Sequence, residues 1–406
     1  YIKFIRFAHW KIEQAGKGIL GFISNNSYLS GVIHRGMRRK LLETFDEIYI
    51  LNLHGSSRIG ERTPEGGKDE NVFDIQQGVT IAIYVKPEES YKEKRIHYAD
   101  LWGLRDKKYE YLFGSDVETT KWQELKPAEP YYFFVPKDFA LQEVYDKFWK
   151  VTEIFKEWSF GVTTSRDHFV VGFTKEEIIQ RLRIFTGSLS DELVKEGLKL
   201  KDTGTWELSE ARQKVAKRNL EEEIYPYAYR PFDIQWICYE PSLIDRGRWP
   251  FMGNLLKDNL SLTVTRILAK SPFAHVFVSD SLSDICLVST KTKETAYSFP
   301  LYLSPDKPKG QLFEKEVSEP KRIPNFTDEF LQAIKESLGT EPAPEEIFYY
   351  IYAILYSPTY RQRYKEFLKI DFPRIPLPTD YEALSIVSSL AMSSLCQKAP
   401  TPRALG

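Results

Sequence analysis

The sequence has few of the residues that would indicate metal or thiol chemistry. Its three cysteines, Cys238, Cys286 and Cys396, lie far apart and form no CxxC pair. This spacing argues against both a zinc site and a disulfide framework, and it fits a reducing cytosol. The six histidines are scattered and show neither HxxxH nor HExxH spacing. We therefore expect a cytoplasmic protein without a metal site.

An excess of one charge and long apolar runs are also absent. The chain carries 56 Lys and Arg against 57 Asp and Glu, so a nucleic-acid interface would have to rest on local basic patches. No apolar run approaches the roughly 18 residues that a membrane span needs. The sequence opens with Tyr1 in what already reads as folded protein, so we expect a fragment of a longer polypeptide.

Several catalytic motifs are missing as well. The chain contains neither a GxSxG nucleophile elbow nor a P-loop, and no glycine-rich nucleotide turn precedes its strands. Ser165, Arg166, Asp167 and His168 include the residue types of a catalytic triad. Four consecutive residues cannot face one another as a triad must, so we interpret them as a turn.

The pattern that is present favours an incomplete α/β sheet followed by a mixed α+β region. Helical spacing over 1–14, apolar strands at 18–24, 47–53 and 78–85, a basic helix at 34–45 and a glycine-containing loop at 54–71 are typical of an open α/β sheet. Proline-rich residues 121–137 read as a linker. Beyond it the sequence predicts a helix at 141–158, a β-like stretch at 160–173, a helix capped by Thr174, short strands at 232–237, 261–265 and 275–278, and helices over 327–370.

Three stretches offer candidate contacts to nucleic acid, each with a simpler structural explanation. Residues 1–40 hold eight Lys or Arg, among them Arg35, Arg38 and Arg39, against one acid. Such a cluster could bind phosphates, or it could be a solvated helix face. Phe73 stands on a loop just before a strand. Its ring could stack on an extruded base, or it could close the edge of the sheet.

The third stretch is the turn at 243–249, with basic and amide residues following it. Arginine suits bidentate contact with guanine, and asparagine suits adenine. The simpler explanation is a surface hairpin in which Asp245 pairs with one arginine. The candidates for DNA contact here are Arg246, Arg248, Asn254, Arg266, Lys291 and Lys293.

Several segments together resemble the later motifs of N6-adenine DNA methyltransferases. In the first part these are GILGFISNNSYL at 18–29, RGMR at 35–38, FDEIYILNLHG at 45–55 and NVFDIQQGV at 71–79. Farther on, YRPFD at 229–233, LIDR at 243–246, HVFVSD at 275–280, KTKE at 291–294 and PNFT at 324–327 resemble the specificity domain of single-chain Type I and fused Type II restriction–modification enzymes.

The resemblance implies an enzyme that uses S-adenosylmethionine to methylate an adenine flipped out of double-stranded DNA. By position, Phe73 matches the family's aromatic residue that stacks on the flipped base. The family's Asn-Pro-Pro-Tyr motif and both cofactor motifs are absent from this chain. We expect them in an upstream methyltransferase half of the same polypeptide. The resemblance also allows nuclease and translocase modules in that polypeptide. This fragment alone should therefore be inactive and should not bind the cofactor.

The resemblance thus predicts residues 1–120 as the end of a Rossmann-like methyltransferase sheet, residues 125–380 as a target-recognition domain, and 381–406 as a Ser- and Ala-rich tail that departs from the family's charged last helix. Two alternatives stay open. One is a DNA-recognition module without enzymatic activity, in which the α/β part is a scaffold. The other is a Rossmann-like metabolite enzyme, which the missing glycine-rich turn disfavours.

Overall fold

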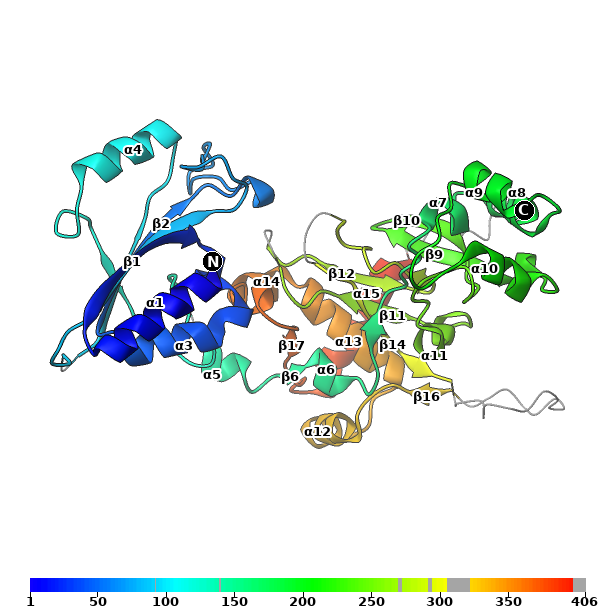
Figure 1. The fold of residues 1–406 in the computed structure, drawn as a ribbon. Coiled ribbons are helices and arrows are strands. Elements are labelled where there is room, and N and C mark those ends of the chain that lie inside the picture. The colour runs from blue at the N-terminus through cyan, green and yellow to red at the C-terminus, as the bar shows by residue number, and fades with distance from the viewer. Residues whose placement is uncertain (92, 139, 269–271, 291–293, 305–321, 397–406) are drawn as a thin grey trace. The chain divides into compact units, whose positions relative to one another are not determined.

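The computed structural model describes residues 1–396 apart from 92, 139, 269–271, 291–293 and 305–321. The chain forms two compact units, residues 1–139 and 140–406 (Figure 1). Both mix helices with β-sheet. Among the described residues, no helix is both long and apolar enough to cross a membrane.

The first unit is built on one five-stranded sheet in the order β1-β3-β2-β4-β5. β3 runs antiparallel between β1 and β2, and β4 runs parallel to β2. The strands β1, β2 and β4 therefore point the same way, and their carboxyl ends share one edge of the sheet. The elements are α1 (Ile2–Ala15), β1 (Gly18–Asn25), α2 (Ser27–Ser30), α3 (Arg35–Thr44), β2 (Glu47–His54), β3 (Val79–Lys86), β4 (Arg95–Asp100), α4 (Arg105–Gly114) and β5 (Gln123–Leu125).

The two faces of this sheet are covered differently. Helices α1 and α3 lie along one face, where Ile5, Leu41 and Phe45 pack with buried strand residues such as Ile50 and Tyr84 (Figure 1). The other face holds a smaller core, Leu51, Leu53, Val72 and Val79, against which Tyr111 and Leu112 of α4 pack. The strands and helices predicted for residues 1–86 are confirmed, because their apolar periodicity matches these two faces.

Residues 121–137 are not a linker. β5 pairs with β4 at the sheet edge, and Phe134 is fully buried in the first core. The first unit therefore extends to residue 139, beyond the predicted boundary at 120–125. The prolines that indicated a linker shape irregular chain that packs back on its own unit.

Over its described residues, the second unit contains two four-stranded sheets, in the orders β13-β9-β10-β8 and β12-β11-β14-β7, and two short strand pairs, β15-β16 and β17-β6. The strands are β6 (Trp149–Lys150), β7 (Ser159–Phe160), β8 (Val171–Gly172), β9 (Ile224–Arg230), β10 (Asp233–Cys238), β11 (Ser261–Val264), β12 (Val276–Ser279), β13 (Leu282–Ser283), β14 (Tyr297–Pro300), β15 (Tyr302–Leu303), β16 (Ile323–Pro324) and β17 (Arg374–Ile375). Its helices are α5 (Gln142–Tyr145), α6 (Val151–Ile154), α7 (Asp167–Val170), α8 (Lys175–Thr186), α9 (Asp191–Gly197), α10 (Leu208–Val215), α11 (Trp249–Met252), α12 (Asp328–Leu338), α13 (Pro344–Tyr356), α14 (Pro358–Arg363) and α15 (Tyr381–Cys396).

Local sequence signals predicted some elements of this unit correctly and others wrongly. The strands expected at 232–237, 261–265 and 275–278 form, and Thr174 and Thr327 each accept a backbone N–H at the start of α8 and α12. The single helix predicted over 141–158 is wrong. That stretch divides into α5, β6 and α6, because Trp149 and Lys150 pair with β17 from the far end of the chain. Long-range pairing overrides the local apolar pattern here.

The C-terminal stretch is also more ordered than the predicted tail. Helix α15 packs on α13, with Leu384 fully buried and the Ser388 hydroxyl donating to the Glu346 carbonyl at 2.9 Å. Residues 397–406 lie outside the described part of the chain. Small residues allow the two helices to approach closely, which is why a Ser- and Ala-rich sequence serves here as a packed helix.

Candidate functional site

The carboxyl edge of the first sheet holds a connected group of polar side chains, which we call the carboxyl-edge cluster: Asn26, Asn52, His54, Tyr98 and Asp100. Asn26 donates to Asn52 Oδ1 at 3.0 Å, and Asn52 donates to the Tyr98 hydroxyl at 3.0 Å. The Tyr98 hydroxyl in turn donates to Asp100. These residues meet because β1, β2 and β4 end at the same edge, where open α/β sheets commonly bind their ligands.

His54 lies between two acidic side chains at the centre of this cluster. Its Nδ1 lies 2.8 Å from Glu61 Oε1, its Nε2 lies 2.6 Å from Asp100 Oδ1, and its ring stacks on Trp102. Burial lowers the pKa of His54, but hydrogen bonds to Asp100 and Glu61 outweigh it, and the pKa stands above its usual value. Sequence analysis did not single out this histidine, since one of its two acidic partners, Asp100, lies 46 residues away.

Phe73 stands on the loop between β2 and β3, which starts at the same edge. Its ring is 44% exposed, while its neighbour Val72 is buried in the small core. Val72 therefore fills the position at the sheet that the simpler explanation gave to Phe73. The Phe73 N–H donates to Asn71 Oδ1 at 2.9 Å, so the residue has a fixed place in the loop.

The basic residues of α3 do not form one phosphate-binding patch. Arg38 was predicted to contact DNA, and this prediction is wrong. Its side chain is fully buried and donates to the carbonyls of Tyr28, Gly31, Tyr131 and Tyr132 over 2.5–3.0 Å. Burial lowers its pKa to about 10. Arg39 is exposed and pairs with Glu43 at 2.8 Å, as in a solvated helix face, and Arg35 is exposed.

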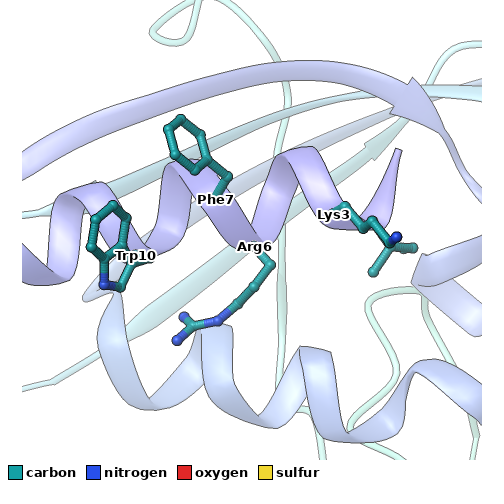
Figure 2. A pocket seen from close by; sticks show the side chains of 5 residues that line it. Lys3, Arg6, Phe7 and Trp10 are labelled. Atoms are coloured by element: carbon teal, nitrogen blue, oxygen red, sulfur yellow. The ribbon is translucent and has the colours of Figure 1, made fainter.

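A hollow of about 520 Å³ on α1 is lined by Ile2, Lys3, Arg6, Phe7 and Trp10, all from one helix (Figure 2). Phe7 and Trp10 are 58% and 42% exposed. A surface of one helix with apolar rings and two basic side chains does not enclose a small molecule in the way that ligand pockets do. It is an open face of the first unit.

In the second unit, the turn at 243–249 is held in place from two sides. Arg246 pairs with Thr163 through both backbone hydrogen bonds, and the Asp245 N–H donates to the Thr164 carbonyl at 3.2 Å. The Tyr239 hydroxyl donates to the Gly247 carbonyl, and the Tyr239 ring stacks on Trp249 at 4.4 Å between centroids. Trp249 thus braces the turn.

The two arginines of this turn differ in what they can reach. The Arg246 side chain is 68% exposed, and its Nε lies 3.7 Å from Asp245, a weak surface contact. Arg248 has a left-handed backbone, with φ of 57°, and its guanidinium lies 5.4 Å from the centre of the Phe160 ring. Its Nε is buried. Of these two arginines, Arg246 is therefore the one whose side chain is more available to a ligand.

The other candidates of this unit have different outcomes. Asn254 is buried, where its amide donates to the Phe251 carbonyl and accepts from the Ser304 N–H, so its prediction as a DNA contact is wrong. Arg266 is half exposed but bound to Asp371 at 2.9 Å. Lys291 and Lys293 lie outside the described residues.

Phe232 is a candidate that residue-type reasoning missed. Arg230 and Asp233 pair across the β9–β10 hairpin, which leaves Pro231 and Phe232 as its two-residue connection. Phe232 is 89% exposed and has φ of 63°, a region where glycine is usual and a bulky residue is strained. Strain that the fold maintains at an exposed position points to a functional constraint. The signal in the sequence was Pro231 followed by Phe232, because a tight turn that begins with proline often has glycine at the next position.

The fold has close counterparts among solved structures. The DrdV–DNA complex matches with a TM-score of 0.72 and 23% identity over 98% of this chain. The ATP-dependent Type ISP restriction–modification enzyme LlaBIII, bound to DNA, matches with 0.70 and 26% over 96%. A nuclease-deletion mutant of the Type ISP enzyme LlaGI, in complex with a DNA substrate mimic, matches with 0.66 and 22% over 96%.

This chain spans 39%, 26% and 30% of the lengths of those three chains. No curated protein matches the sequence. The model of the Type ISP C-terminal specificity domain matches residues 153–390, which is more than half of the chain and lies wholly within the second unit. By this match, and with the fold of the Type ISP enzymes over nearly its whole length, the chain belongs to the family of the Type ISP C-terminal specificity domain.

Proposed function

We propose that this chain reads a DNA target sequence and supplies the downstream end of an N6-adenine DNA methyltransferase within a restriction–modification polypeptide. Sequence-specific recognition falls to the second unit, where the family match lies and where Arg246 and Phe232 are exposed. The solved relatives LlaBIII and LlaGI are held on DNA or on a DNA mimic. The first unit completes the methyltransferase sheet.

The observation that carries the methyltransferase assignment is the presentation of Phe73. A 44% exposed aromatic ring stands on a loop fixed in position, at the carboxyl edge of an α/β sheet. A flat exposed ring held in this way suits an extruded base, because every base has a face that stacks. The buried position in the small core belongs to Val72, so packing in that core does not account for the Phe73 ring.

The described residues do not fit S-adenosylmethionine. The hollow on α1 is lined by one helix, and a second hollow among the described residues of the first unit, between β2, β3 and α4, has about 190 Å³ and mainly apolar walls. Ligand pockets usually hold about 300–1,000 Å³. We therefore assign the cofactor to another part of the polypeptide. When bound there, it would supply the methyl group, while Phe73 holds the adenine ring.

The test uses the intact polypeptide and a duplex that carries its target site. Phe73→Ala should slow methylation of adenine N6 by about five- to 150-fold, the equivalent of about 1–3 kcal/mol of base stacking. Phe73→Trp should retain most of the rate. A polypeptide that binds the target but incorporates no methyl group would favour a recognition module without enzymatic activity. Wild-type rates for Phe73→Ala would remove the assigned role of the ring.

A further inference from the structure

Four consecutive backbone carbonyls of the Phe73 loop accept hydrogen bonds from side chains of a single helix, α4. Lys108 Nζ donates to the Glu70 carbonyl at 2.7 Å, and Arg105 Nε donates to the Asn71 carbonyl at 2.7 Å. The Tyr109 hydroxyl donates to Val72 at 2.5 Å, and Arg105 Nη2 donates to Phe73 at 3.2 Å. The backbone on both sides of the exposed ring is thus bound by α4, and we call Arg105, Lys108 and Tyr109 the α4 clamp.

The spacing of the clamp residues explains how one short helix does this. Residues at positions i, i+3 and i+4 lie on the same face of a helix, so the three side chains project together toward the loop. Lys107 and Glu110 form an ion pair of their own at 2.7 Å and are 75% and 70% exposed. These two residues therefore lie on the same helix, but their side chains are not among those that bind the loop.

The clamp is itself fixed to the sheet. Lys108 and Asp69 are both fully buried and lie 2.7 Å apart, and Lys108 also donates to the Leu53 carbonyl at the end of β2. Asp69 accepts the N–H groups of Gly55 and Gly103 at 2.6 and 2.8 Å. A buried pair with all its partners in place permits little displacement. The position of α4 over the loop is therefore set by the ends of β2 and β4.

The loop needs such external support. Residues 71–78 contain neither helix nor strand, so no ladder of backbone hydrogen bonds fixes their course. Inside the loop, Asn71 donates to the carbonyls of Gly55 and Gln77 and accepts the Phe73 N–H. Apart from this asparagine, α4 provides the hydrogen bonds that reach residues 72 and 73.

We propose that α4 is a positioning device for the base-stacking ring, with Arg105 and Tyr109 as positioning residues that act through Phe73. This inference rests on the proposed function of Phe73. Arg105 and Tyr109 touch the backbone of the loop and not its ring, so they hold the ring at the angle that a stacked base requires. Small misplacements of a positioning group slow a reaction strongly even when binding is unchanged.

The test compares variants of the intact polypeptide in single-turnover methylation at saturating duplex, together with the dissociation constant of the duplex. Arg105→Ala should slow methyl transfer about tenfold, and Tyr109→Phe, which removes one hydroxyl and keeps the ring, about threefold. The dissociation constant should stay within about twofold of the wild type in both. Lys107→Ala, on the same helix, is the matched control and should have the wild-type rate.

A double-mutant cycle separates positioning from a general effect on the fold. In a Phe73→Ala background, Arg105→Ala and Tyr109→Phe should slow the reaction by no more than about a further twofold, because the ring on which they act is gone. If the rate loss of the double variant equals the product of the two single losses, the proposal is overturned. It is also overturned if both α4 variants react at the wild-type rate while Phe73→Ala is slow. If Phe73→Ala methylates at the wild-type rate, the proposed function of Phe73 is wrong, and the positioning role of α4 is wrong with it.

Discussion

At the scale of single residues, arginines with the same sequence context take opposite roles. Arg38 and Arg39 are neighbours on α3, yet one is fully buried and the other is an exposed partner of Glu43. Helix periodicity separates them, because consecutive residues point about 100° apart. The guanidinium of Arg38 donates to four backbone carbonyls, of which that of Gly31 also accepts the His34 N–H at 3.1 Å.

Arg38→Ala should therefore destabilise the first unit by more than about 3 kcal/mol, since it leaves several buried carbonyls without a donor. Arg39→Ala should leave the stability close to that of the wild type, because the ion pair with Glu43 is exposed and screened by solvent. Thermal and urea unfolding of the two variants measures both effects. Equal stabilities would mean that water satisfies the carbonyls that Arg38 binds.

A second residue-scale prediction concerns the turn at 243–249. Arg246→Ala in the intact polypeptide should relax recognition at one base position, at a cost of roughly 1–3 kcal/mol, if this exposed side chain meets a base edge. Arg248→Ala should instead lower thermal stability, because its guanidinium packs over Phe160. Mapping methylated sites across a genome distinguishes the two. If both variants methylate the same sites as the wild type at the same rates, the turn is only a surface hairpin.

At the scale of elements, the carboxyl-edge cluster joins β1, β2 and β4 through side chains that lie far apart in the sequence. The ion-paired His54 between Glu61 and Asp100 gives this edge a dependence on pH. Because its pKa is raised in the folded state, its contribution to stability is complete below its unfolded value of about 6.5 and is lost as pH rises through the folded value.

The free energy of unfolding of the first unit should accordingly fall as pH rises above about 6.5, the usual pKa of histidine, and His54→Gln should remove this fall. Burial lowers the pKa of His9, so that histidine acts in the opposite direction and below its usual pKa. Thermal unfolding followed across this pH range checks the prediction. An unchanged fall in His54→Gln would assign it to another group.

At the scale of the whole molecule, the net charge of -1 gives no sign of DNA binding, so the proposed affinity for DNA would have to come from local charge. The family match covers residues 153–390, and it is there that we propose recognition to lie. Each phosphate that this unit contacts should lower the slope of log affinity against log salt by about 0.9. Titration of duplex DNA with this chain at several salt concentrations measures that slope. Affinity that stays flat between low and high salt would exclude a phosphate-contacting interface.

The sequence by itself determined the elements whose residues act locally. Apolar periodicity predicted β1, β2 and β3, side-chain caps predicted the starts of α8 and α12, and ordered motifs indicated the family that residues 153–390 match. These signals depend on neighbours within a few residues, so they can be read from the sequence without knowledge of the fold.

Only the tertiary structure decided which of the polar residues face outward. Arg38 and Asn254 enter the interior because carbonyls from distant segments need their donors, and Trp149 and Lys150 become a strand because β17 pairs with them. The carbonyls bound by α4 likewise belong to residues more than thirty positions away from it. Burial and hydrogen-bond partners of this kind depend on contacts that no local pattern contains, and so a candidate list drawn from residue types included interior residues and omitted Phe232.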